Sequence, residues 1–254
     1  MKITFLGTGT SQGVPMIACD CLICKSTDVR DKRLRSSLWI QEGSTSIVID
    51  TGPDFRYQML RADVQKLDAI LLTHEHKDHI AGLDDIRAFN YVQQSPIDVY
   101  AHLRVQKALK REFKYIFDGP DVIGIPKINL HSISKKNNFS IHGITIVPIE
   151  ALHYKLPVLG FRINDCTYIT DAKTISVLEK KKIIGSKVLI INALQNEPHF
   201  SHFTLNEAIA LSEEINPTMT FLTHVSHRMG KYVDIQKQLP PNVFLAYDGM
   251  SFTV

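Results

Sequence analysis

The chain has 254 residues, of which 44% are hydrophobic and 22% charged, and its formal net charge is +3. This balance excludes a disordered chain, and so mild a positive charge does not predict a nucleic-acid-binding protein. No apolar run reaches the ~20 residues of a membrane span, and MKITFLGTGT lacks the apolar core of a secretory signal. We therefore expect a cytoplasmic protein, in which clustered thiols more often bind metal than form disulfides.

Segments rich in Ile, Val, Leu and Thr alternate with amphipathic segments along the chain. The first kind favours strands, which we expect at 3–7, 37–41, 45–50, 68–73, 98–102, 144–150, 158–163, 167–171, 187–192, 219–224 and 243–247. The second kind favours helices, which we expect at 79–89, 104–116, 173–183 and 204–215. Thr204 and Glu207 have the spacing of a capping box at the start of the last helix. No repeat or linker divides this pattern, so we expect one α/β domain over residues 1–254.

The first strand is followed by GTGTSQGVP and then by CDCLIC, where Cys19, Cys21 and Cys24 lie within six positions. The glycines allow a turn with exposed N–H groups that suits a phosphate, although a plain connection fits equally well. The three thiols indicate metal ligands that lack a fourth partner or, alternatively, a reactive thiol group. Cys166 stands alone in a strand and is expected to be buried and inert.

The strongest motif is THEHKDH at 73–79, between an apolar strand and a predicted helix. His74 and His76 point to one side of an extended turn, whereas Asp78 and His79 face differently and could reach a second ion. Imidazole and carboxylate suit Zn, Mn or Fe, and ligands gather at strand ends of α/β sheets. The motif therefore predicts a site for divalent metal.

Four later residues with ligand chemistry lie at or just past apolar strands, namely His153, Asp171, His202 and His224. Each alone is weak evidence, because a single His at a strand end is usually a surface or core residue. Together with the upstream motif at 73–79, however, the four residues point to one common site. The intervening stretch 116–130 is rich in Gly, Pro and Asp, and we expect an irregular surface loop there.

The HxHxDH motif followed by a separate His, an Asp and another His resembles the metallo-β-lactamase superfamily. The resemblance implies a four-layer αβ/βα sandwich, in which two mixed β-sheets are flanked by helices and a dinuclear metal site lies between the sheet edges. It implies one ion on His74, His76 and His153, a second on Asp78, His79 and His224, and Asp171 as the bridge. Asp50, in VIDTGPDF, matches an aspartate that orients such ligands, and a turn before Gly52 would also favour Asp.

Two close divalent ions lower the pKa of a bridging water and stabilise negative charge on a phosphoryl or carbonyl oxygen. The resemblance therefore implies a metal-dependent hydrolase, in which Asp78 and Asp171 act together with a proton donor. His202 lies in SHFTLNEA, which is similar to the H-x-T-x-x-E-A element of the phosphodiesterase branch, and is expected to be that general acid. His199 is the rival donor.

GTGTSQGVP and CxCxxC together resemble the PhnP family of phosphoribosyl cyclic phosphodiesterases, and the likeness extends to AYDGM near the end of the chain. It implies a structural Zn²⁺ held by Cys19, Cys21, Cys24 and His227, a closed set of soft ligands that suits zinc. It also implies hydrolysis of phosphoribosyl 1,2-cyclic phosphate or a 2′,3′-cyclic nucleotide, with Mn²⁺ or Zn²⁺ in the active site. Relatives suggest a homodimer, for which the sequence offers no distinct patch.

Two other functions compete. A tRNA 3′-processing nuclease would need a long basic arm, and the lysine-rich stretches 135–138 and 180–182 are short. A non-catalytic binding protein, like the pyrroloquinoline-quinone biosynthesis member, would have lost most dinuclear ligands, whereas all seven are present here. We therefore expect a small phosphodiester as partner, and neither nucleic acid nor a membrane.

Overall fold

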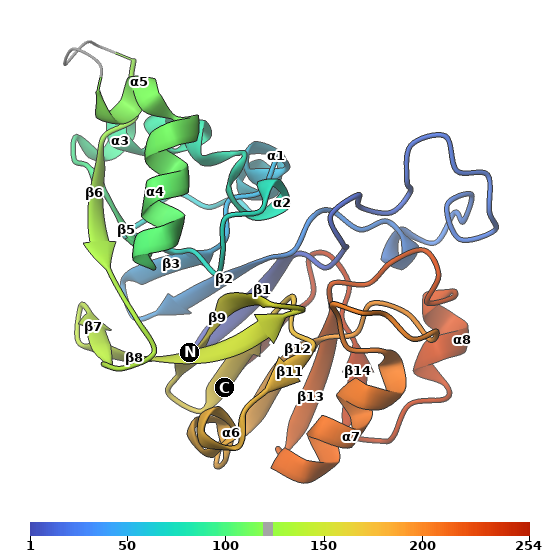
Figure 1. Ribbon diagram of the computed structural model, residues 1–254. Helices are drawn as coiled ribbons and strands as arrows, with labels where there is room; N and C mark the ends of the chain where they lie inside the picture. The colour runs from blue at the N-terminus through green and yellow to red at the C-terminus, as the bar shows by residue number, and fades with distance from the viewer. Residues whose placement is uncertain (119–123) are drawn as a thin grey trace.

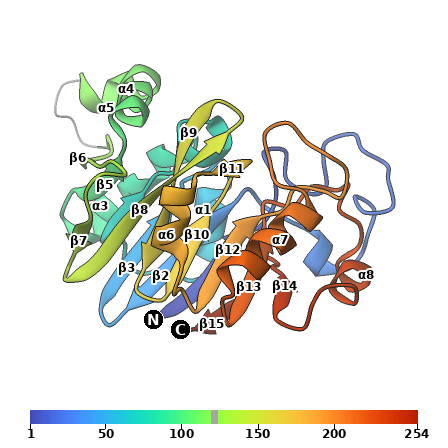
Figure 2. The ribbon, with the colours of Figure 1, turned by 60° about the horizontal axis from the view of Figure 1, so that its bottom comes forward.

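The computed structural model describes residues 1–118 and 124–254. Two mixed β-sheets pack face to face, and helices cover the outer face of each sheet (Figures 1 and 2). This is the expected αβ/βα sandwich. In the described part of the chain, no helix is long and apolar enough to cross a membrane.

The first sheet has seven strands in the order β15-β1-β2-β3-β4-β5-β6. Neighbours from β15 to β3 are antiparallel, and those from β3 to β6 are parallel. Its strands are β1 (Lys2–Gly7), β2 (Ser37–Glu42), β3 (Thr45–Ile49), β4 (Ala69–Leu71), β5 (Ile97–Ala101), β6 (Ile128–Ser132) and β15 (Ser251–Thr253). The helices in this half are η1 (Val29–Asp31), α1 (Phe55–Arg61), α2 (Lys77–Ile80), η2 (Leu83–Ile86), α3 (Arg87–Gln93), α4 (Leu103–Glu112) and α5 (Lys114–Phe117).

The second sheet has eight strands, in the order β11-β8-β9-β10-β12-β13-β14 with β7 paired to β8. It changes from antiparallel to parallel pairing after β10. Its strands are β7 (Phe139–Ile141), β8 (Ile144–His153), β9 (Leu156–Ile163), β10 (Cys166–Ile169), β11 (Thr174–Ile175), β12 (Val188–Asn192), β13 (Met219–Thr223) and β14 (Val243–Leu245). The helices in this half are α6 (Val177–Ile183), α7 (Leu205–Ile215) and α8 (Tyr232–Gln236).

The main core lies between the sheets. Ile47 and Ile49 of β3 belong to the same buried cluster as Phe161 of β9 and Ile190 of β12. Every residue of β3 is buried, as expected of a strand that is covered on both faces. Two further apolar clusters join the outer face of each sheet to its helices. The layered core thus fixes the two sheets relative to each other and holds their strand ends at one edge.

The expected strands are confirmed with shifts of a few residues at their ends, and the capping box of α7 is present. The expected helix at 79–89 is wrong: it is divided into α2, η2 and α3. Gly82 lies so close to the preceding loop that a Cβ there would be 2.1 Å from the carbonyl oxygen of Gly52. Tertiary packing of two loops therefore overrides the local helical pattern.

The expected helix at 104–116 is also interrupted, at Phe113, between α4 and α5. The start of the segment 173–183 is strand β11, because Thr174 and Ile175 pair with β8 and Ser176 then caps α6. Of the expected loop at 116–130, residues 119–123 lie outside the described part, and its end is strand β6. The sequence does not predict six further elements, because their residue patterns are weak: α1, α8, β6, β7, β11 and β15.

Candidate metal centre

The ends of four strands supply the central side chains of the site. Asp50 follows β3, the motif at 73–79 follows β4, Asp171 follows β10 and His224 follows β13. Asp50, Asp171 and His224 have left-handed backbones, with φ of 63°, 57° and 55°. Such angles cost a non-glycine residue about 1 kcal/mol or more and persist where the surroundings enforce them. This repeated distortion occurs where the strands must turn beside one another.

One group of potential metal ligands consists of Asp78, His79, Asp171 and His224, whose ligand atoms lie within 4.8 Å of one another. Nε2 of His79 is 3.1 Å from Oδ2 of Asp78 and 3.4 Å from Oδ1 of Asp171. Nδ1 of His224 is 3.2 Å from Oδ1 of Asp171. Two carboxylates and two imidazoles at this spacing are a suitable donor set for a divalent cation.

A second group shares Asp171 and adds His153 and His202, again within 4.8 Å. Nε2 of His202 is 3.3 Å from Oδ2 of Asp171, and Nε2 of His74 is 3.8 Å from the same oxygen. Nδ1 of His153 donates to the carbonyl of Ser201 at 3.0 Å, so its Nε2 remains available as a ligand. Asp171 therefore has one carboxylate oxygen in each group.

His74, His76 and His153 were expected as one ligand set, and the structure brings their rings together. The ring centroids are separated by 4.6 Å for His74 and His76, 5.2 Å for His76 and His153, and 5.9 Å for His74 and His153. The tighter group beside Asp171, however, contains His202, the expected proton donor. The division of these histidines between ligand and acid therefore stays a prediction.

Asp50 supports the cluster from behind. Its Oδ2 is 2.6 Å from Nδ1 of His79, and its Oδ1 accepts a hydrogen bond from the backbone N–H of Thr73 at 2.8 Å. The Thr73 hydroxyl contacts both Asp50 and Nδ1 of His74. A carboxylate on the rear nitrogen fixes the orientation of a ligating imidazole.

Sequence reasoning missed three polar partners of the cluster, Ser36, Thr73 and Ser201. The Ser36 hydroxyl lies 3.1 Å from Nδ1 of His224, and the Ser201 hydroxyl lies 3.0 Å from Nδ1 of His202. Thr73 and Ser201 directly precede a predicted site histidine, which is a usable signal. Ser36 comes from a distant segment, and its position depends on how the two sheets pack.

The buried nitrogens of the cluster fit a bound cation. Nε2 of His74 and Nε2 of His79 are buried and form no hydrogen bond of suitable geometry among the described residues, although carboxylate oxygens lie 3.8 and 3.1 Å away. Burial would lower the pKa of His79, but Asp78, Asp171 and Asp50 more than offset this and raise that pKa well above its usual value. A divalent ion between the same carboxylates would replace the proton, since metal and proton compete for the nitrogen. Burial lowers the pKa of His74, which favours the neutral, ligating form.

The three clustered cysteines surround one histidine. Sγ of Cys19, Cys21 and Cys24 lies 3.3, 3.5 and 3.6 Å from Nδ1 of His227. Bond lengths of ~2.3 Å to sulfur and ~2.0 Å to nitrogen in a tetrahedron place ligand atoms about 3.5 Å apart. The arrangement therefore has the dimensions of a closed zinc site, and His227 is in the place expected of the fourth partner.

The cysteine site lies next to the end of β13. Thr10 N–H donates to the carbonyl of Val225 at 3.2 Å, and Val225 N–H donates to the carbonyl of Thr8 at 2.8 Å. The carboxylate of Asp248 accepts from the N–H of Thr8 at 2.9 Å. The GTGT turn is thus hydrogen-bonded to the residue that follows His224. Cys166 is separate and only 3% exposed, and burial raises the pKa of its thiol.

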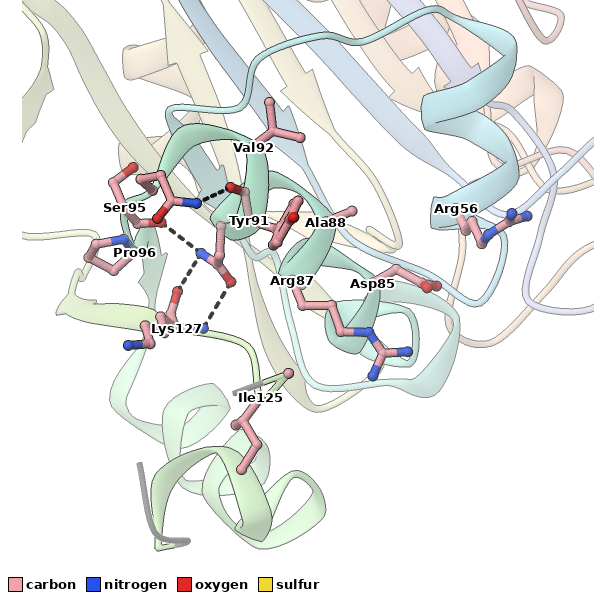
Figure 3. A pocket seen from close by; sticks show the side chains of 13 residues that line it. Arg56, Asp85, Arg87, Ala88, Tyr91, Val92, Ser95, Pro96, Ile125 and Lys127 are labelled. Atoms are coloured by element: carbon pink, nitrogen blue, oxygen red, sulfur yellow. Dashed lines mark hydrogen bonds between the residues drawn. The ribbon is translucent and has the colours of Figure 1, made fainter. Parts of the chain in front are cut away.

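The cavities differ in chemistry. One cavity, of about 950 Å³, lies between α3 and the segment before β6, and its lining includes Arg56, Tyr91 and Lys127 but neither His nor Cys (Figure 3). A smaller cavity of about 340 Å³ is lined by His199, His227 and residues 10–13, which follow the first strand. The smaller cavity therefore adjoins the cysteine cluster at His227, and His199 on its wall lies 5.1 Å, ring to ring, from His202.

A two-sheet sandwich that carries a His/Asp cluster at one edge defines the metallo-hydrolase class of folds. Residues 45–225 match the family model described as a β-lactamase superfamily domain. A crystal structure of a new diphosphatase from the PhnP family is 35% identical, with a TM-score of 0.92 and coverage of 99% of this chain and 96% of that one. The chain belongs to the β-lactamase superfamily and, within it, to the PhnP family.

Two curated relatives extend the comparison. The octanoyltransferase of Porphyromonas gingivalis is 36% identical over 252 residues, which are 98% of this chain and 51% of that protein. The ribonuclease Z of Crocosphaera subtropica is 30% identical over 190 residues, 73% of this chain and 53% of that protein. The chain thus spans about half the length of these relatives, so their names describe longer proteins.

Proposed function

We propose that the protein is a metal-dependent phosphodiesterase that hydrolyses small cyclic phosphodiesters. The observation that carries the proposal is the position of Asp171, whose two carboxylate oxygens face two separate groups of potential ligands. One carboxylate between two such groups is suited to hold a pair of ions a few ångströms apart. We assign the ligands as His74, His76 and His153 for one ion, Asp78, His79 and His224 for the other, and Asp171 between them.

Two divalent ions bound here would supply a water of lowered pKa and positive charge opposite the phosphoryl oxygens. In the overall reaction one P–O ester bond breaks, the oxygen of water stays on phosphorus, and a proton reaches the leaving oxygen. His202 is positioned for that transfer, because its Nε2 lies 3.3 Å from Asp171 and its Nδ1 lies 3.0 Å from the Ser201 hydroxyl. Asp78 and Asp171 complete the proposed catalytic group, and Asp50 orients His79.

The cofactors we propose are two Mn²⁺ or Zn²⁺ ions in this cluster and one structural Zn²⁺ at Cys19, Cys21, Cys24 and His227. The hard and borderline donors of the first site accept either metal, whereas three sulfur ligands favour zinc. The two sites should therefore differ in how readily they release metal. A chelator should remove the active-site ions, whereas the cysteine-bound zinc should remain.

Membership of the PhnP family and the similarity to a structure described as a diphosphatase favour a phosphorus-centred reaction. As substrates of this protein we propose phosphoribosyl 1,2-cyclic phosphate and 2′,3′-cyclic nucleotides, which share a five-membered cyclic phosphate on a ribose.

The ribonuclease Z relatives keep a tRNA-processing nuclease as an alternative. Three of the five lysines in the segments 135–138 and 180–182 form ion pairs: Lys180 with Glu214, Lys182 with Glu179, and Lys135 with Glu150. Cations neutralised in this way release few counterions from a nucleic acid. tRNA binding at low salt, together with strongly salt-dependent cleavage, would favour this alternative over ours.

The relative named octanoyltransferase gives an acyl ester as a further alternative substrate, because the same cluster could stabilise an oxyanion on carbon. The match covers only half of that protein, so its name need not refer to the matched half. A non-catalytic binding role is disfavoured, since five of the seven expected ligands fall in the two ligand groups and the rings of His74 and His76 contact that of His153.

The test is a substrate panel with the purified protein: bis-p-nitrophenyl phosphate, the two cyclic phosphates, an octanoyl ester and a pre-tRNA. We expect hydrolysis of the diesters and a large loss in His76→Ala. Full activity of that variant, or activity on the octanoyl ester alone, would refute the proposal.

A further inference from the structure

Two exposed aromatic side chains meet at the edge of the metal-binding cluster. Phe200 is 69% exposed and Tyr154 is 55% exposed, yet their rings pack edge to face with centroids 5.7 Å apart. Tyr154 is in the turn between β8 and β9, and Phe200 is in the loop between β12 and α7. Among the described residues, Phe200 is the only exposed phenylalanine. An apolar surface kept in water at this position indicates a binding role.

The pair is continuous with the site. The ring of Phe200 stacks on His199 at 4.8 Å, and the ring of His199 lies 5.1 Å from His202. Nε2 of His202 is in turn 3.3 Å from Asp171. On the other side, Tyr154 directly follows His153, whose ring is 4.5 Å from His202. A substrate held at Asp171 therefore needs to extend past only one or two side chains to reach the pair.

The chemistry of the pair selects a planar ring. Aromatic faces bind bases by stacking, which is tolerant of base identity and contributes ~1–3 kcal/mol per base. The amine of Lys155 lies 5.3 Å from the Tyr154 ring and supplies a cation on the same rim. A sugar phosphate without a base would leave this surface in water.

We propose that Phe200 and Tyr154 form a platform for the base of a nucleoside phosphodiester, so that 2′,3′-cyclic nucleotides are preferred over cyclic sugar phosphates. This inference rests on the proposed phosphodiesterase function and deepens it by naming the substrate class. The cyclic phosphate lies at the His/Asp cluster, and the base lies over the exposed rings. Phe200 and Tyr154 act in binding only and take no part in the proton transfer.

The experiment compares Phe200→Ala and Phe200→Trp with the unchanged protein, using adenosine 2′,3′-cyclic phosphate and phosphoribosyl 1,2-cyclic phosphate. Phe200→Ala should raise KM about tenfold for the adenosine substrate, which corresponds to ~1.4 kcal/mol. For the adenosine substrate, kcat of Phe200→Ala should stay within about twofold of the value for the unchanged protein. For the phosphoribosyl substrate, which has no base, both kcat and KM should stay within about twofold. Phe200→Trp should restore the low KM for the adenosine substrate. Tyr91→Ala is the matched control, since Tyr91 is 80% exposed but lines the cavity of Figure 3, which contains no residue of the His/Asp cluster.

Equal increases in KM for both substrates, or no change for the adenosine substrate, would overturn the platform. Binding of adenosine 3′-monophosphate and of ribose 5-phosphate, measured by calorimetry, separates this result from failure of the proposed function. If no diester is hydrolysed but Phe200→Ala still weakens adenosine 3′-monophosphate selectively, the phosphodiesterase assignment is wrong and the platform stands. If binding is also unchanged, the platform is wrong.

Discussion

The carboxylate of Asp50 lies 2.6 Å from Nδ1 of His79, and neither side chain has any exposed surface. Asp50 also accepts hydrogen bonds from the backbone and hydroxyl of Thr73, so its position is fixed by the strand end on which it sits. His79 in turn directs Nε2 toward Asp78 and Asp171. A residue that touches no expected substrate thus sets the direction of a proposed metal ligand.

Replacing Asp50 by Asn should weaken active-site metal binding by about 10- to 100-fold, because the charge that holds His79 is lost while the shape is kept. Chelator competition measures the affinity. Asp98→Asn is the control, since Asp98 makes a similar contact of 3.0 Å with His131 outside the site. If the metal affinity of Asp50→Asn were unchanged, the proposed role of Asp50 in orienting His79 would be wrong.

His202→Ala should keep both active-site metals and lower kcat by about 10²- to 10⁴-fold on substrates with poor leaving groups. A p-nitrophenolate leaves without a proton, so its release should suffer less. Metal analysis and a leaving-group series measure the two effects, and His199→Ala tests the rival donor. Loss of a metal from His202→Ala would instead make His202 a ligand, as its position beside His153 and Asp171 allows.

Cys21→Ser should lose the structural zinc and lower Tm by several degrees, because the closed ligand set links the N-terminal loop to the segment after His224. Zinc content and thermal unfolding measure this effect. Cys166→Ala provides a control that removes a thiol from the core without touching the zinc ligands. If Cys21→Ser abolished activity in a folded protein that retained its zinc, the structural role would be wrong.

Glu207 gives a pH-dependent contribution at the start of α7. Partial burial would raise the pKa of its carboxyl, but the Lys173 amine, 2.7 Å away, and the N–H of Thr204 offset this and lower the pKa. Because the pKa of Glu207 is lower in the folded than in the unfolded protein, its ionised carboxylate stabilises the fold at pH values above the unfolded pKa of about 4.3. This stabilisation is lost as the pH falls through the folded pKa.

Glu207→Gln should therefore be less stable than the unchanged protein at pH 7, by under ~1 kcal/mol because the pair is partly exposed and screened by solvent. The difference should vanish well below pH 4. Denaturant unfolding of chelator-treated proteins at several pH values measures it. A difference that persists at pH 3 would assign the effect to the loss of shape and not of charge.

The sequence predicted the features that repeat along the chain or lie in one motif. The apolar strands, the capping box at Thr204 and the convergence of THEHKDH with Asp171 and His224 all appear in the structure. His227 was placed beside the cysteines through family resemblance, because spacing alone cannot connect residues about two hundred positions apart.

What the sequence did not predict depends on tertiary contacts. The division of the helix at Gly82 reflects the close approach of the loop at Gly52, which no local pattern encodes. Ser36 reaches His224 only because the two sheets pack face to face, which brings the start of β2 beside the end of β13. The exposed position of Phe200 likewise follows from the folded loop, since an apolar residue is expected to be buried.

The most direct test of the account is a metal titration of chelator-treated protein. Mn²⁺ or Zn²⁺ is added stepwise, while the metal bound per chain and the hydrolysis of bis-p-nitrophenyl phosphate are measured on the same samples. We predict that full activity requires two ions per chain in addition to the zinc held by the cysteines. Full activity in the treated protein, or a maximum at a single added ion, would contradict the dinuclear site.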